Sequence, residues 1–185
     1  MNLPNKLTML RVLLIPVYVV FLSYTPFWCQ IVALLVFIFA CLTDLFDGKI
    51  ARARNLVTNF GKFADPIADK LLVMSGYVVL VAQSRMPAWV CIVFLAREFM
   101  ISGLRLVAAG MGNVISAGML GKIQTVTQMI ATMAIILLIP VGEQAPRLGD
   151  AGVIIANVLM YIALAMTIAS GVDYMIKNRD CINDM

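Results

Sequence analysis

Four aspartates in the first half of the chain are candidates for a metal-binding or catalytic site. Asp44 and Asp47 are three positions apart, and Asp65 and Asp69 are four apart. If both segments are helical, each pair shares one face, and the short connection makes the two helices antiparallel neighbours. Carboxylates this close repel one another unless some are protonated or cations lie among them. The cluster therefore predicts a cation site.

The available ligands narrow the choice of cation. The chain has no histidine, and its four cysteines lack the spacing of a metal site. Oxygen ligands alone favour hard ions, so we expect Mg²⁺ or Mn²⁺, as a pair that would hold a diphosphate. The alternative is that the aspartates pair with basic neighbours at a membrane interface. Those neighbours are Lys49, Arg52, Arg54 and Lys62.

The elements that must position these acids are predicted from composition. Hydrophobic residues make up 62% and charged residues 13% of 185 residues, and the mean hydropathy is +0.96. A soluble core of this size could not hide so much apolar surface, so we expect an all-α polytopic membrane protein, with one domain over residues 1–185. Six apolar segments are long enough to span a bilayer. They cover residues 7–24, 28–43 with a polar continuation to 54, 63–82, 87–109, 120–141 and 153–176.

Orientation and partners follow from charge. In a six-span arrangement, only Arg85 and Arg147 of the 14 lysines and arginines fall on one side. The excess of positive charge predicts that both termini and the acids lie on the cytoplasmic side of the inner membrane. The net charge of +4 is scattered among apolar runs. This distribution indicates anionic lipid and phosphate-bearing substrates as partners and argues against nucleic acid.

The acids belong to a longer motif, DLFDGKIAR at residues 44–52, followed after eight residues by GKFADPIAD at residues 61–69. This motif resembles the signature of the CDP-alcohol phosphatidyltransferases at every defining position, and the six-span plan is similar too. The resemblance implies a helical bundle with CDP-diacylglycerol as donor. It implies that Asp44, Asp47 and Asp65 hold one metal ion and that Asp44, Asp65 and Asp69 hold the second. By the same resemblance, Asp69 is the base that takes the proton of the attacking hydroxyl.

The family pattern also implies a site for the CDP part of the donor, lined by Gly48, Arg52 and Thr58. Gly61, like Gly48, would let a ligand approach the helix closely. The alternative for either glycine is close helix packing or a helix end. Thr58 is alternatively a helix cap or a solvated residue.

Two further stretches, residues 5–11 and 97–105, resemble the subfamily that uses sn-glycerol 3-phosphate as acceptor. In the first stretch, Asn5 and Thr8 either contact the CDP-lipid or cap the first helix. Basic residues are the candidates for holding the acceptor phosphate. These are Arg11, Lys62, Arg97, Arg105 and Lys122. Arg97 alternatively pairs with Glu98 or a metal-site aspartate, and the others alternatively snorkel to lipid phosphates.

The implied reaction gives phosphatidylglycerol phosphate and CMP, and the family suggests a homodimer. Rival acceptors within the family are inositol phosphate, inositol, serine and phosphatidylglycerol. A neutral acceptor would leave Arg105 and Lys122 without a substrate partner. A cation channel or transporter is the rival of another class, because intramembrane carboxylates also line ion paths. Such a path predicts charges through the full membrane depth, whereas the acids gather at one end.

Overall fold

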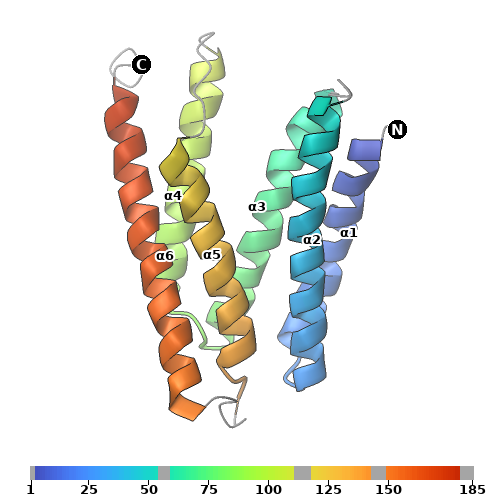
Figure 1. The fold of residues 1–185 in the computed structure, drawn as a ribbon, viewed down its shortest axis with the longest axis vertical. Helices are drawn as coiled ribbons and strands as arrows, with labels where there is room; N and C mark the ends of the chain where they lie inside the picture. The colour runs from blue at the N-terminus through green and yellow to red at the C-terminus, as the bar shows by residue number, and fades with distance from the viewer. Residues whose placement is uncertain (1–2, 54–58, 111–117, 143–148, 180–185) are drawn as a thin grey trace. The chain divides into compact units, whose positions relative to one another are not determined.

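The computed structural model describes residues 3–53, 59–110, 118–142 and 149–179, which form six helices and no strand (Figure 1). The helices are α1 (Leu3–Ser23), α2 (Phe27–Ala53), α3 (Asn59–Ala82), α4 (Ala88–Gly110), α5 (Met119–Leu138) and α6 (Gly149–Lys177). Each predicted apolar segment corresponds to one helix, which confirms the all-α prediction. The polar continuation of the second segment is part of one unbroken helix that ends at Ala53.

The helices group into two compact units, Met1–Ser84 with α1 to α3 and Arg85–Met185 with α4 to α6. Each unit is described by itself. The sequence predicts a single catalytic domain over residues 1–185, and that assignment stays a prediction.

In the first unit, α1 packs against both α2 and α3. Its buried positions alternate by three and four residues: Thr8, Arg11, Ile15, Tyr18 and Leu22. This spacing keeps one stripe of a helix turned toward its neighbours over several turns. Helices α2 and α3 touch each other, as their short connection predicts, but each packs more extensively on α1. Helix α1 is therefore the common partner in this unit.

Hydrogen bonds at one end of this unit fix the directions of the helices. The side-chain amide of Gln30 donates to the carbonyl oxygens of Leu22 at 3.0 Å and Tyr24 at 2.6 Å, which closes the turn from α1 to α2. Gln83, just after α3, donates to the same Leu22 oxygen at 2.6 Å. Because the C-terminal ends of α1 and α3 meet there, these two helices are parallel and α2 is antiparallel to both.

In the second unit, α6 packs against both α4 and α5. Gln128 on α5 donates to the Thr167 hydroxyl on α6 at 3.2 Å, in the buried interior. The buried Arg85 guanidinium, before α4, donates to the carbonyl oxygens of Ile135 at 2.5 Å and Ile136 at 2.6 Å. These carbonyls lie in the last turn of α5, where helix oxygens have few backbone donors; Ile135 also accepts from the Ile139 N–H at 3.2 Å. Arg85 therefore joins the start of α4 to the end of α5.

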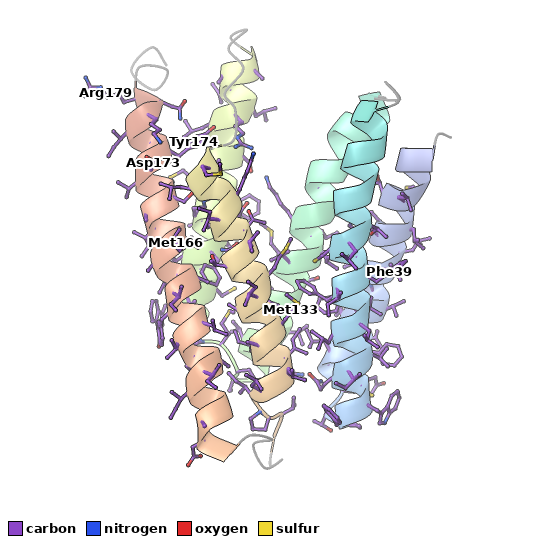
Figure 2. All side chains as sticks on the ribbon, viewed as in Figure 1. Phe39, Met133, Met166, Asp173, Tyr174 and Arg179 are labelled. Carbon is purple, nitrogen blue, oxygen red and sulfur yellow. The ribbon has the colours of Figure 1, made fainter. Side chains whose placement is uncertain are left out.

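The surface of the described helices is strongly apolar. Large hydrophobic side chains are exposed on all six helices and project outward in Figure 2, where Phe39 of α2 is one of the labelled examples. Within the described residues, α5 and α6 are long and apolar enough to cross a membrane. Within the same described residues, the first three helices contribute shorter apolar stretches: Leu7–Ser23, Phe27–Thr43 and Lys70–Ala82. Helix α4 is continuous, but its apolar sequence contains the charged residues Arg97, Glu98 and Arg105.

Candidate functional site

The four aspartates of the motif all lie on helices of the first unit. Asp44 and Asp47 belong to the C-terminal part of α2, and Asp65 and Asp69 to the N-terminal part of α3. Because α2 and α3 are antiparallel, these parts are at the same end of the unit. The helical backbone confirms the spacing that puts each pair on one face. The side chains of these four aspartates are not among those that the structure describes.

The buried stripe of α2 leads toward the motif. Four of its buried positions follow the three-and-four spacing that faces a packed neighbour: Gln30, Ala33, Phe37 and Ala40. Cys29 and Thr43 are buried beside this series. The next two positions in that series are 44 and 47, still within the helix. Gly48 and Arg52 follow on the same helix, and Gly61 and Lys62 lie in the first turn of α3.

The start of α1 contributes two buried polar residues, Thr8 and Arg11, each with 0% of its surface exposed. Helix α1 already begins at Leu3, so Asn5 and Thr8 lie inside it and neither caps its start. The alternative interpretation of both as helix caps is wrong for that reason. Their predicted contact with the CDP-lipid stays a prediction, and Thr58 lies outside the described residues.

Arg97 is part of a polar cluster that joins the three helices of the second unit. Its Nη1 donates to Glu98 Oε1 at 2.6 Å, and its Nη2 donates to Ser170 Oγ on α6 at 2.8 Å. Gln124 on α5 donates to the same Glu98 oxygen at 3.4 Å. The pairing of Arg97 with Glu98, which the sequence left as an alternative, is confirmed. A role for Arg97 in binding the acceptor phosphate stays a prediction.

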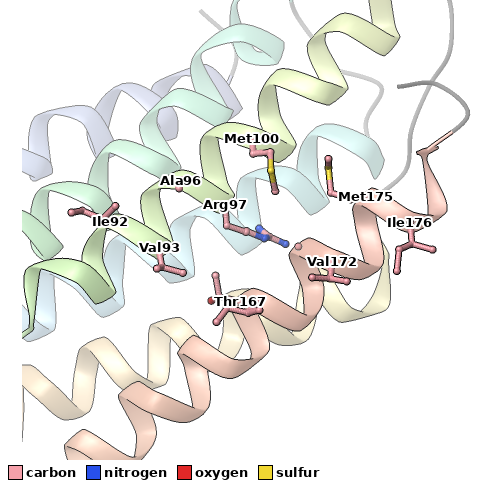
Figure 3. Close-up of a pocket in the computed structure, with 11 residues that line it drawn as sticks. Ile92, Val93, Ala96, Arg97, Met100, Thr167, Val172, Met175 and Ile176 are labelled. Atoms are coloured by element: carbon pink, nitrogen blue, oxygen red, sulfur yellow. The ribbon is translucent and has the colours of Figure 1, made fainter. Parts of the chain in front are cut away.

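Small residues make room for the Arg97 side chain. A Cβ atom at Gly121 on α5 would lie 3.5 Å from Arg97 Nη2, and one at Gly171 on α6 would lie 3.5 Å from Arg97 Cγ. An open groove of about 430 Å³ between α4 and α6 is lined mostly by apolar side chains, together with Thr167 and with Arg97, which reaches toward α6 in Figure 3. Sequence reasoning missed Gln124 and Ser170; their signal was a polar side chain within an apolar run.

The remaining basic candidates of the second unit lie at the end where α4 finishes and α5 begins. Arg105 Nε donates to the Tyr174 hydroxyl at 3.2 Å, and its guanidinium carbon lies 5.6 Å from the centre of that ring. Arg105 and Lys122 are both exposed. Figure 2 labels Tyr174 and Arg179 at this C-terminal end of α6. The five basic residues predicted for one acceptor pocket are thus divided between the units, with Arg11 and Lys62 in the first.

The donor set of the motif fits a hard cation. It offers four carboxylates, and neither histidine nor cysteine stands among the motif residues, which is the ligand chemistry that Mg²⁺ and Mn²⁺ prefer. The metal-site acids are outside the side chains that the structure describes. Among the described residues, no three acidic, histidine or cysteine side chains come together as metal ligands. The fit therefore rests on ligand type and on the helical spacing of the motif.

Comparison with known proteins identifies the family. Residues 1–169 match the model of the CDP-alcohol phosphatidyltransferases, so the chain belongs to that family. A CDP-diacylglycerol–glycerol-3-phosphate 3-phosphatidyltransferase of Bacillus subtilis is 41% identical, over 98% of this chain and 97% of the relative. A protein of the same name from Rickettsia typhi is 38% identical over 94% of each chain. A probable phosphatidylglycerophosphate synthase of Mycobacterium tuberculosis is 37% identical, over 95% of this chain and 81% of the relative.

Proposed function

We propose that this chain transfers the phosphatidyl group of CDP-diacylglycerol to sn-glycerol 3-phosphate, which gives phosphatidylglycerol phosphate and CMP. The observation that carries the proposal is the name shared by the Bacillus and Rickettsia relatives, which are 41% and 38% identical and cover almost the whole chain. The positions of the motif aspartates support it, because all four lie on α2 and α3, at the same end of the first unit.

Asp44, Asp47, Asp65 and Asp69 are the residues that would hold two Mg²⁺ or Mn²⁺ ions. When bound, such ions polarise the diphosphate and stabilise the negative charge that develops on the leaving phosphate. Gly48 has no side chain, which would let the diphosphate approach the helix closely. Arg52, Thr58 and Gly61, with Asn5 and Thr8, complete the proposed site for the CDP-lipid.

In the transfer step, Asp69 accepts the proton of a glycerol hydroxyl. The hydroxyl oxygen then forms a bond to the phosphorus that carries diacylglycerol, and the bond from that phosphorus to the bridging oxygen breaks. CMP leaves with the bridging oxygen. A positioned base of this kind contributes roughly 10²- to 10⁴-fold to a rate.

The acceptor phosphate is assigned to basic residues. Arg105 and Lys122 are exposed at the end of the second unit where α4 finishes and α5 begins. In the proposed orientation this end is on the cytoplasmic side, where a soluble anion would reach them. Tyr174 positions the Arg105 guanidinium through its hydroxyl and ring. Lys62 is the further candidate from α3. Charge-assisted bonds of this type favour an acceptor with its own phosphate over serine or inositol.

We propose that the six helices cross the inner membrane, with both termini and the acids on the cytoplasmic side. The apolar side chains exposed on every helix support contact with lipid. Three exposed aromatic residues, Tyr24, Trp28 and Trp89, lie near helix ends. Such residues favour the interface between lipid and water. A homodimer remains the oligomeric state we propose on family grounds.

An acceptor panel tests this proposal. Purified protein in detergent with CDP-diacylglycerol and Mg²⁺ is offered glycerol 3-phosphate, inositol phosphate, inositol, serine or phosphatidylglycerol, and CMP release is measured. We expect release with glycerol 3-phosphate, and its loss in EDTA. Release with another acceptor but none with glycerol 3-phosphate would reject the acceptor, whereas no release with any would reject the reaction.

A further inference from the structure

Arg11 is an arginine buried inside the first unit, with 0% of its surface exposed. Removing a guanidinium from water costs several kcal/mol unless an anion or several oxygens compensate it. Between residues 1 and 84, the extent of this unit, the sequence holds only four acidic residues. All four are the motif aspartates of α2 and α3.

Tyr18 marks the layer of the unit in which all three helices meet. Its ring lies 5.6 Å from that of Phe37 on α2, measured between ring centres. Its hydroxyl lies against Gly76 on α3, where any Cβ atom would collide with it. Tyr18, Phe37 and Gly76 are therefore at one height, on faces that are turned toward one another.

Seven residues are two turns of a helix, so a step of seven returns to nearly the same face about 10.5 Å along the axis. From Tyr18, a step toward the start of α1 reaches Arg11. Because α3 is parallel to α1, the same step from Gly76 reaches Asp69. Because α2 is antiparallel, the step from Phe37 goes forward and reaches Asp44. Residues 11, 44 and 69 are thus equivalent positions in the next layer.

The residues between the two layers support this register. Ile15 of α1, Ala40 of α2 and Leu72 of α3 lie between the Tyr18 layer and the Arg11 layer, and all three are buried. The three helices therefore stay packed on these faces over the intervening turn. The relative positions of the three helices are therefore established up to Ile15, which is about one turn from Arg11.

We propose that Arg11 is the resident counter-charge of Asp44 and Asp69, and so a positioning residue of the cation site, in place of its predicted role as a ligand of the acceptor phosphate. This inference rests on the proposed function for the identity of the cation site. The guanidinium offsets one of the four negative charges and holds α1, α2 and α3 together when no cation is bound. Divalent cations take over that neutralisation when they bind, so the need for Arg11 is greatest in the metal-free protein.

The test is thermal unfolding of the full-length protein in detergent, with EDTA and with saturating Mg²⁺. In EDTA we expect Arg11→Gln to lower the Tm by ~5 °C or more, because one more of the four carboxylate charges is left without compensation. In Mg²⁺ we expect less than half of that loss. Arg11→Lys, which keeps the charge, should retain most of the wild-type Tm in EDTA.

Arg85→Gln is the matched control, because Arg85 is also buried but donates to the carbonyl oxygens of Ile135 and Ile136. Its loss of Tm should be the same in EDTA and in Mg²⁺. If Arg11→Gln does not fold, the double variant Arg11→Gln/Asp69→Asn decides, since removing one carboxylate should recover folding. A double-mutant cycle on Tm in EDTA should accordingly show strong non-additivity.

The outcomes separate this inference from the proposed function. Equal losses of Tm in EDTA and Mg²⁺ for Arg11→Gln would overturn the counter-charge role, as would an unchanged Tm with only a raised KM for glycerol 3-phosphate. A double variant no more stable in EDTA than Arg11→Gln would also overturn it. If the wild-type protein itself gains no Tm from Mg²⁺ and releases no CMP, the proposed function fails instead.

Discussion

Asp69 has two proposed tasks, because it would bind a cation and also accept the proton of the acceptor. We predict that Asp69→Asn lowers the rate of CMP release at least ~100-fold, because both tasks need the carboxylate. Asp173→Asn is a suitable control, since Asp173 lies on α6 in an exposed pair with Lys177, at 2.9 Å. Its activity should stay within about twofold of wild type. Full activity of Asp69→Asn would remove it from the mechanism.

Arg105 and Lys122 differ from Asp69 in acting on one substrate. We predict that Arg105→Gln or Lys122→Gln raises KM for glycerol 3-phosphate by ~10-fold or more, since a hydrogen bond to a charged group contributes about 1.5–3 kcal/mol. The KM for CDP-diacylglycerol should not change. Lys177→Gln, near the same end of the second unit, is the control. Equal increases in both KM values would indicate a general defect and contradict the assignment.

The sequence predicts single residues of the site better than their partners. The motif aspartates were found from type and spacing, and Glu98 was correctly named as a possible partner of Arg97 because it is the next residue. Ser170 and Gln124 were missed because each is far along the chain from its partner, and only packing brings them close. Ser170 lies 73 positions from Arg97, and Gln124 lies 26 positions from Glu98. Periodicity shows which face of a helix is buried but not which helix covers it.

At the scale of elements, the apolar segments predicted all six helices to within a few residues at each end. The unbroken helix α2 was harder to predict, because its last turns are polar while its first turns are apolar. The place of α1 against both α2 and α3 was not predicted. The short connection between α2 and α3 predicted that these two helices are neighbours. In the structure, most of the packing of each is against α1.

The contact of Gly76 with Tyr18 gives a test of this arrangement. We predict that Gly76→Ala destabilises the protein by ~1–3 kcal/mol, because a Cβ atom collides with the Tyr18 hydroxyl. Tyr18→Phe in the same chain should recover part of that loss, as a double-mutant cycle of unfolding free energies would show. Gly103→Ala on α4 is the control, since no atom lies within 4 Å of its Cβ position. Additive effects of the two changes would contradict the contact.

At the scale of the whole molecule, the six-span arrangement predicts which residues face the cytoplasm. In a background without the four native cysteines, Thr25→Cys in the turn after α1 should react with a membrane-impermeant maleimide added outside intact cells. Lys177→Cys at the end of α6 should react only after the cells are opened. Both positions are exposed. Labelling of Lys177→Cys from outside would contradict the proposed orientation.

Transfer of a phosphatidyl group to glycerol 3-phosphate can be measured directly with an isotope-labelled acceptor. The protein is reconstituted into vesicles with CDP-diacylglycerol and given ¹³C-labelled glycerol 3-phosphate with Mg²⁺, and the lipids and CMP are quantified by mass spectrometry. We predict one labelled phosphatidylglycerol phosphate for each CMP, and neither product in EDTA. CMP released without labelled lipid would show hydrolysis and would contradict the claim.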